Sequence, residues 1–128
     1  MDQMNKLIVY LMAICGCCKN LHYNIPDYGI HLFADRVQDG LDEFIDEIKE
    51  NCILAVGDEV LNSSEYFVMA AKTTPDVVSL NSLKDLLVET LQQLELQSEK
   101  LSLGSGDLLG RIGNHLQNSL GVLNILEK

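Results

Sequence analysis

Apolar residues recur along this chain at the three- and four-residue spacing of an amphipathic helix. The pattern predicts four long helices, with approximate ranges 4–23, 27–56, 80–101 and 107–126. The breaks between them contain residues that end helices, namely Pro26, Gly57 and the run Gly104-Ser105-Gly106. We therefore expect four long helices that pack their apolar faces together.

A fifth, shorter helix is predicted between the second and third long helices. The run Asn62-Ser63-Ser64-Glu65 offers an N-terminal cap for a helix from Tyr66 to Ala71, and Pro75 ends the pattern. Four long amphipathic helices with one long connection are typical of a ferritin-like four-helix bundle. We expect an all-α fold of this kind and, at 128 residues, a single domain over residues 1–128.

Composition agrees with this fold and limits the function. Apolar residues make up 47% of the chain, Trp is absent and there are two Pro, as expected of a helical protein. The 19 acidic residues exceed the 9 basic ones, which gives a net charge of −10. Such a surface attracts cations and disfavours binding to nucleic acid through general basic contacts.

The chain is expected to be cytoplasmic. Its longest apolar run, Leu7 to Cys18, has twelve residues, whereas a membrane span needs about 20. The charges near the N-terminus do not form the positive region of a signal peptide. The cysteines, expected to be reduced thiols, are Cys15, Cys17, Cys18 and Cys52. Cys15 and Cys18 could share a helix face and bind a soft metal, although small buried core residues are the simpler interpretation.

Residues that can bind metal gather on one side of the predicted second helix. If residues 27–56 form one helix, the four residues His31, Asp35, Asp46 and Glu50 fall within an arc of roughly 100°. The apolar residues of the same segment lie on the opposite side; they are Ile30, Phe33, Ala34, Val37, Leu41, Phe44, Ile45, Ile48 and Cys52. This acidic stripe of four residues is therefore predicted to point away from the core.

The spacing of the acidic stripe allows a shared metal site only between two chains. The pair that begins at His31 and the pair that begins at Asp46 are separated by roughly 16 Å along the helix axis, too far for one ion to bind both. A second copy, antiparallel about a two-fold axis near residues 40 and 41, would place the His31 pair of one chain opposite the Asp46 pair of the other. Imidazole and carboxylate ligands suit iron, manganese or zinc. The alternative is a solvated acidic face without a metal.

The residues around His22 resemble a known family. The run Lys19-Asn20-Leu21-His22-Tyr23-Asn24-Ile25 is similar to the end of the first helix of the Dps proteins, the dodecameric miniferritins, in which a metal-binding His is followed by an aromatic residue and Asn. The acidic stripe repeats the ferroxidase spacing of that family. The similarity extends over nearly the whole chain, including the short connecting helix.

The resemblance implies a protein that oxidises and stores iron. One chain would contribute His22, His31 and Asp35 to each site, and its partner would contribute Asp46 and Glu50. The firmest ligands would be Glu50, Asp46 and His22, while the other two could orient water or a second iron. Fe(II) would be oxidised, preferentially by hydrogen peroxide, and stored as ferric mineral inside a shell of twelve subunits built from two-fold dimers. Zinc or manganese could bind at the same site.

Several further expectations concern individual segments. The N-terminal extension that carries DNA-binding lysines in some family members is nearly absent, so we expect no DNA binding. His22 and His31 are closer in sequence than is usual in the family, so the turn at Pro26 is shortened. Whether His31 reaches the metal depends on this turn. Asp107 could line an iron entry pore, with a solvated helix cap as the simpler alternative. His115 has no acidic neighbour one turn away and is expected to be a surface residue.

Two other functions are compatible with the same sequence. One is a ferritin-like shell or interaction protein whose metal site is degenerate and does not turn over. The other is a helical adaptor that uses the acidic stripe to bind a basic protein. A particle mass near twelve times 14.2 kDa would separate the shell proteins from a monomeric adaptor.

Overall fold

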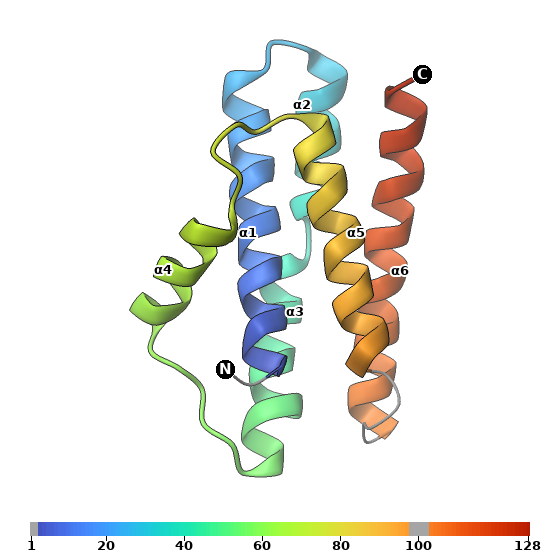
Figure 1. The fold of residues 1–128 in the computed structure, drawn as a ribbon. Coiled ribbons are helices and arrows are strands. Elements are labelled where there is room, and N and C mark those ends of the chain that lie inside the picture. Colours follow the sequence, from blue (N-terminus) through green and yellow to red (C-terminus); the bar gives the residue numbers. More distant parts are fainter. Residues whose placement is uncertain (1–2, 98–102) are drawn as a thin grey trace.

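The computed structural model of this chain describes residues 3–97 and 103–128, and it confirms the prediction of an all-α fold. The described elements are α1 (Gln3–Asn24), α2 (Tyr28–Gln38), α3 (Leu41–Glu47), the π-helix η1 (Ile48–Ile53), the 3₁₀-helix η2 (Leu54–Val56), α4 (Ser63–Thr73), α5 (Leu80–Gln97) and α6 (Leu103–Leu126). No described residue belongs to a β-strand. The long helices lie side by side, and α4 packs on the outer side of α1 (Figure 1).

The helix α1 is central to the fold. It packs against α2, α4 and α5, so side chains on several of its sides are buried. Val9, Tyr10, Met12 and Ala13 lie off the main apolar stripe, which predicts that α1 is buried both in its own bundle and against another subunit. In the structure the chain itself buries Val9, Tyr10 and Ala13, whereas Met12 is only partly buried. The central position of α1 within one chain therefore accounts for most of its apolar character on several sides.

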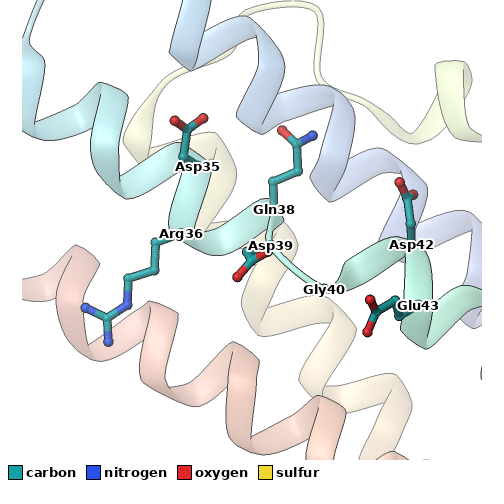
Figure 2. A pocket seen from close by; sticks show the side chains of 7 residues that line it. All are labelled: Asp35, Arg36, Gln38, Asp39, Gly40, Asp42 and Glu43. Carbon is teal, nitrogen blue, oxygen red and sulfur yellow. The ribbon is translucent and has the colours of Figure 1, made fainter.

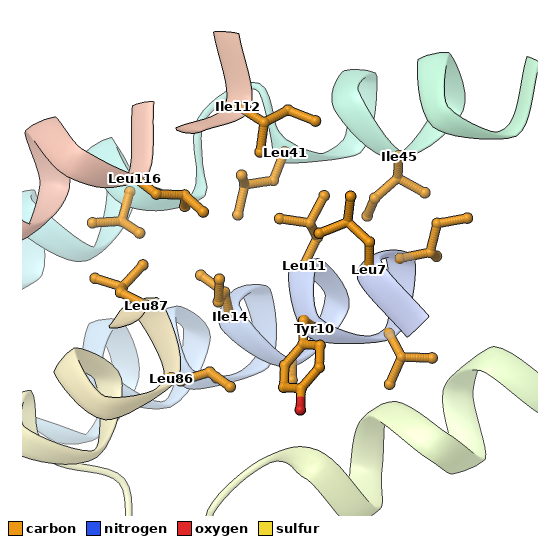
Figure 3. Close-up of a cluster of buried hydrophobic side chains, with 14 of the residues drawn as sticks. Leu7, Tyr10, Leu11, Ile14, Leu41, Ile45, Leu86, Leu87, Ile112 and Leu116 are labelled. Carbon is orange, nitrogen blue, oxygen red and sulfur yellow. The ribbon is translucent and has the colours of Figure 1, made fainter. Parts of the chain in front are cut away.

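The core lies between α1 and the helices that face it (Figure 3). Leu7, Leu11 and Ile14 project from α1 and are almost completely buried. The buried side chains around them come from α3, α5 and α6 and include Leu41, Ile45, Leu86, Leu87, Ile112 and Leu116. Burying one such side chain stabilises the fold by about 1.5–3 kcal/mol relative to leaving it in water. This burial determines which faces of the helices remain exposed.

The second long helix is interrupted, so the prediction of one helix over residues 27–56 is wrong. The segment divides after Gln38 into α2 and α3, and Asp39 between them has an extended backbone. Gly40 has a φ of 80°, in the left-handed region that glycine adopts without steric cost. The apolar face nevertheless stays on the core side, because Val37 and Leu41 on either side of the break are both buried.

The lower part of this segment also departs from a regular α-helix. After Glu47 the chain continues as the π-helix η1 and then as one turn of 3₁₀-helix, η2. The predicted end at Gly57 is confirmed, because Gly57 has a φ of 86° and its amide donates to the Leu54 carbonyl at 3.0 Å. Single π-turns inside helices are frequent at functional sites, and Glu50 of the predicted site lies in this one.

The segment before α4 is held against α1 by hydrogen bonds of a buried tyrosine, Tyr66. The predicted short helix exists as α4, but it begins at Ser63 and Asn62 makes no side-chain cap hydrogen bond; Tyr66 on it is 2% exposed. Its hydroxyl donates a hydrogen bond to the Asn5 side chain of α1 and accepts one of 3.2 Å from the Leu61 amide. Lys49 of η1 lies over the same ring, 5.1 Å from its centroid. These contacts fix α4 and the chain before it against α1.

The last helix begins earlier than the sequence predicts. The predicted loop Gly104-Ser105-Gly106 is wrong, because α6 starts at Leu103 and contains all three residues. Ser105 is buried, and its hydroxyl donates a hydrogen bond of 3.4 Å to the Asn51 carbonyl of η1. Packing of this first turn against η1 outweighs the helix propensity of glycine, which is about 1 kcal/mol less favourable than that of alanine. Glu99 and Leu101, which the sequence assigns to the third helix, lie outside the described residues.

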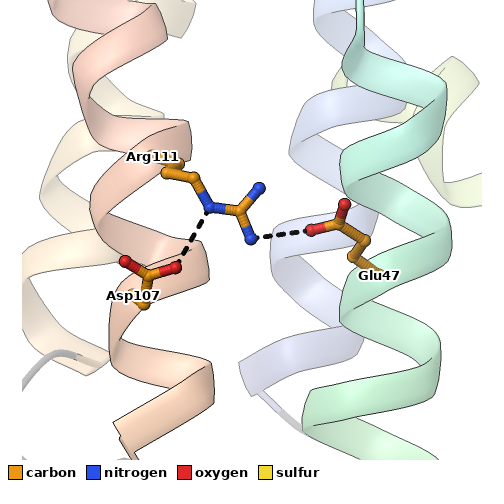
Figure 4. A network of polar contacts seen from close by, with 3 residues as sticks. All are labelled: Glu47, Asp107 and Arg111. Carbon is orange, nitrogen blue, oxygen red and sulfur yellow. Dashed lines mark hydrogen bonds and ion pairs between the residues drawn. The ribbon is translucent and has the colours of Figure 1, made fainter.

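An exposed network of charges joins α6 to α3 (Figure 4). The guanidinium of Arg111 donates through Nη2 to Glu47 at 3.0 Å and through Nε to Asp107 at 3.2 Å. Solvent screens such pairs, so they contribute little to stability. The helix-cap interpretation of Asp107 is wrong, because α6 begins at Leu103 and Asp107 lies one turn inside it, where it pairs with Arg111 of the same helix.

The structure also bears on the membrane prediction. Within residues 3–97 and 103–128, none of the helices combines the length and the apolar character that crossing a bilayer requires.

Candidate metal centre

A short turn brings the end of α1 next to the start of α2. Asp27 caps α2 as predicted, because its carboxylate accepts a hydrogen bond of 3.1 Å from the Ile30 amide. Only residues 25–27 separate the two helices, so α2 folds back along α1 and His31 lies beside His22. The centroids of the two imidazole rings are 3.6 Å apart, with an angle of 30° between the ring planes.

His22, His31 and Asp35 form a cluster of potential metal ligands, which we call the ligand cluster. Each residue offers one ligand atom, and the three atoms all lie within 4.8 Å of one another. In the part of the chain that the structure describes, no other group of three His, Cys, Asp or Glu side chains comes together in this way. The two histidines are half-buried and Asp35 is exposed, so the cluster is open to solvent on one side.

A backbone contact orients the ring of His31. Its Nδ1 lies 2.9 Å from the carbonyl oxygen of His22. A carbonyl can only accept, so Nδ1 carries the proton and Nε2 keeps a free lone pair when the ring is neutral. Metal-binding histidines are commonly held in this manner, since the hydrogen bond fixes both the tautomer and the ring orientation. His31 is therefore prepared to bind a metal through Nε2.

The contact between His22 and Asp35 is short but is not a hydrogen bond. Nδ1 of His22 lies 2.7 Å from Oδ1 of Asp35, within ion-pair distance. The same Nδ1 is shielded from solvent and has no hydrogen-bond partner, so the oxygen lies away from the direction in which an N–H would point. Two lone-pair atoms this close repel each other unless a proton or another cation lies near both. This pair of atoms is the strongest indication of a cation site in the structure.

Two tyrosines border the ligand cluster. The ring of Tyr23 meets His22 edge-on with centroids 4.8 Å apart, and the ring of Tyr28 stacks on His31 at 6.1 Å. Tyr23 is the aromatic residue that the resemblance places near the metal, and its ring does contact a predicted ligand. Both tyrosines are largely exposed, at 79% for Tyr23 and 72% for Tyr28.

Asp46 and Glu50 do not join the ligand cluster within one chain. They lie beyond the break at Gly40, Asp46 on α3 and Glu50 on η1, and both side chains are exposed. Among the described residues neither forms an ion pair or side-chain hydrogen bond. The sequence predicts that these carboxylates act on a partner's site, and their position leaves them available for that role.

An acidic depression lies beside the ligand cluster, around the break between α2 and α3 (Figure 2). Its volume is about 730 Å³, and its acidic lining residues are Asp35, Asp39, Asp42 and Glu43. Arg36 is the one basic residue among the lining side chains. Asp35 belongs both to this depression and to the cluster, so cations attracted by the depression arrive next to the candidate ligands.

Comparison with known proteins adds nothing to this geometry. No family model, curated protein or solved structure matches the chain. The resemblance to the Dps proteins therefore stays a prediction from a short motif and a spacing.

The cysteines behave as core residues near this site. Burial raises the pKa of both Cys15 and Cys17 to about 11. Burial, helped by the two neighbouring thiols and by the charge of Asp35, raises the pKa of Cys18 further. None of these thiols belongs to the ligand cluster, and their burial fits the interpretation of small core residues.

His115 is a residue whose role the sequence does not reveal. The prediction of a surface residue is wrong, because the side chain is half-buried and its Nε2 lies 2.8 Å from the Val37 carbonyl of α2. The hydrogen bond joins residues 78 positions apart, so local sequence could not have indicated it.

Proposed function

We propose that this protein is a Dps-like miniferritin that binds Fe(II) at the ligand cluster, oxidises it and stores the ferric product. The observation that carries the proposal is the unpartnered Nδ1 of His22, 2.7 Å from a carboxylate oxygen. A transition-metal ion between the imidazoles and the carboxylate would take the place of the proton that this contact otherwise needs.

The donor set suits the proposed substrate. Nitrogen and oxygen ligands bind a first-row metal at about 2.0–2.2 Å, so neighbouring ligand atoms around one ion lie about 3 Å apart. The ligand atoms of the cluster lie within 4.8 Å of one another, so side-chain movements of up to about 2 Å would bring them to this spacing. Two imidazoles with a carboxylate suit iron, zinc or manganese rather than calcium or magnesium, which prefer oxygen alone.

Three ligands leave part of the coordination sphere open, and a second copy of the chain would complete it. In our proposal the carboxylates of Asp46 and Glu50 come from that copy, related by a two-fold axis near the break at Gly40. Their exposure and lack of described partners within the chain support this assignment. The larger assembly, twelve subunits around a hollow space in a ferritin-like bundle arrangement, is part of the same proposal.

The residues of the chain have distinct roles in the proposed reaction. The acidic depression would concentrate Fe(II), and the hydrogen bond from His31 to the His22 carbonyl would hold the imidazole with Nε2 available to the ion. Each hydrogen peroxide takes one electron from each of two Fe(II) ions and, with two protons, leaves as two water molecules. The carboxylates neutralise the charge that iron gains on oxidation.

Anaerobic titration with Fe(II), followed by addition of hydrogen peroxide, tests the proposal. The double variant Asp46→Ala with Glu50→Ala should lose most of the oxidation rate and keep the helical content. The matched control is Asp58→Ala with Glu59→Ala, which removes the same two kinds of acid at exposed positions outside the site. Equal oxidation rates in the two double variants would overturn the ferroxidase proposal.

A second function is supported by the position of Asp46 and Glu50. Because these carboxylates lie outside the ligand cluster in one chain, the cluster could bind a metal with three protein ligands and not turn over. In that case Co(II) or Zn(II) would bind one ion per chain to a protein whose mass in solution is that of a monomer, 14.2 kDa. Light scattering on the metal-loaded protein separates this function from the miniferritin.

A further inference from the structure

The break between α2 and α3 frees a backbone carbonyl that another helix then satisfies. In a continuous α-helix the Val37 carbonyl would accept the amide of Leu41, one turn later. Here the last backbone bond of α2 joins the Asp39 amide to the Asp35 carbonyl at 3.0 Å, and the first bond of α3 joins Phe44 to Gly40 at 3.1 Å. The Val37 carbonyl instead accepts a hydrogen bond of 2.8 Å from Nε2 of His115 on α6.

The same imidazole also contacts the other side of the break. The ring of Phe44 on α3 meets His115 edge-on, with centroids 6.0 Å apart. His115 therefore touches the last turn of α2 through its nitrogen and the first turn of α3 through its ring. We call the residues from Val37 to Phe44 the joint.

The opposite side of the joint is open. Gln38, Asp39 and Gly40 line the acidic depression, and a Cβ atom added at Gly40 would meet nothing within 4 Å. Packing thus holds the joint from the core side alone, where His115 lies. Apart from the core, the other described tie between α6 and α3 is the exposed pair of Arg111 with Glu47.

The joint lies between the two halves of the acidic stripe. Asp35 and the rest of the ligand cluster are on the α1 and α2 side, whereas Asp46 and Glu50 are on the α3 and η1 side. The angle at the joint therefore decides where the second pair of carboxylates lies relative to the first. In an assembly about a two-fold axis, that angle also decides whether the carboxylates of one copy reach the cluster of the other.

We propose that His115 is a positioning residue, which fixes the joint and thereby places Asp46 and Glu50 for the partner's metal site. This inference rests on the proposed function. The role needs only a donor at Nε2, which both the protonated ring and the neutral tautomer with its hydrogen there provide. It depends on a hydrogen bond and not on a charge, so glutamine, whose amide can donate over a similar reach, should substitute for it.

Hydrogen exchange and iron oxidation together test the inference in three variants of the whole chain. In His115→Leu, exchange of the Asp39 and Phe44 amides should accelerate by about threefold to tenfold, because one hydrogen bond that closes the joint is lost. Peroxide-driven Fe(II) oxidation should fall by about tenfold or more, since the carboxylates are misplaced. Co(II) binding to the ligand cluster should stay unchanged, because its three residues lie on α1 and α2. His115→Gln should restore both exchange and oxidation, and Asn118→Leu, an exposed change on the same helix, should alter neither.

The outcomes separate this inference from the proposed function. If oxidation by His115→Leu equals that of the unaltered chain, or exchange at the joint does not change, His115 does not position the carboxylates. If glutamine restores neither property, the hydrogen bond to Val37 is not the reason. If the unaltered protein does not oxidise iron, the proposed function fails, while exchange still decides whether His115 holds the joint. If His115→Leu does not fold, His115→Asn is used in its place, because the asparagine side chain is too short to reach the Val37 carbonyl.

Discussion

His22 and Asp35 approach each other to 2.7 Å without a hydrogen bond between them. The first comes from the end of α1 and the second from the middle of α2, so only the fold brings them together. A proton or a metal ion can relieve the repulsion between the two lone-pair atoms, and the imidazole of His31 beside His22 offers a further ligand to a metal.

Removal of either member of this pair should abolish tight metal binding. His22→Ala and Asp35→Asn should each weaken Co(II) affinity by about 100-fold or more, because loss of a direct ligand exceeds the 10–100-fold effect of supporting residues. Isothermal titration or the visible spectrum of bound Co(II) measures the change. Asp39→Asn is the control, since Asp39 lines the same depression but lies outside the ligand cluster. Equal losses in all three variants would indicate nonspecific binding to an acidic surface.

The two types of glycine in this chain should respond in opposite directions to alanine. Gly40→Ala should lower the free energy of unfolding by about 1–2 kcal/mol, because its φ of 80° strains a residue with a Cβ atom. Gly110→Ala in α6 should raise the free energy of unfolding by about 0.5–1 kcal/mol, since a helix interior with open space around the new Cβ favours alanine. Urea unfolding of both variants measures the difference. A neutral Gly40→Ala would mean that the joint adopts another backbone conformation in solution.

The buried hydroxyl of Tyr66 should matter for stability. Tyr66→Phe leaves the side chain of Asn5 and the amide of Leu61 without this partner, and a buried polar group without a hydrogen bond costs about 1–3 kcal/mol. Chemical denaturation should show a loss of this size, whereas Tyr23→Phe at an exposed position should change the stability by less than about 0.5 kcal/mol. Equal stabilities of the two variants would show that the hydrogen bonds of the Tyr66 hydroxyl do not stabilise the packing of α4 against α1.

The buried thiols predict a loss of stability in alkaline solution. The pKa of Cys15 and of Cys17 is raised from 9.0 to about 11 by burial. Because the folded pKa lies above that of the unfolded chain, the stabilising effect is complete below pH 9 and is lost as the pH rises toward 11. Tyr10 should continue this loss of stability at higher pH, because burial and the hydrogen bond to Glu89 raise its pKa to about 12. Urea unfolding across this pH range should show a steady decline.

A matched variant identifies the groups responsible for the alkaline decline. Cys17→Ala should start from a lower stability at neutral pH, because it removes buried volume, but should decline less steeply above pH 9. A decline with the same slope in both proteins would assign the effect to other groups.

The sequence by itself determined that the fold is all-α and which face of most helical segments is apolar. Helical periodicity is a local property, so the apolar residues from Ile30 to Cys52 could be assigned to one face, and they pack in the core on both sides of the break. Local signals also located the cap at Asp27 and the stop at Gly57. The three carboxylates of the acidic stripe could be placed on the exposed side for the same reason, whereas His31 is half-buried against His22.

Only the tertiary structure decided where the second long helix breaks, where α6 begins and which candidate ligands meet. Each of these depends on contacts between segments far apart in sequence: His115 satisfies Val37 across the joint, Ser105 packs against η1, and the turn at Pro26 brings His31 onto His22. Helix propensity and periodicity carry no information about such contacts. They arise because buried polar groups must find partners and apolar faces must pack in three dimensions, and here those requirements outweigh the local preference for a longer, unbroken helix.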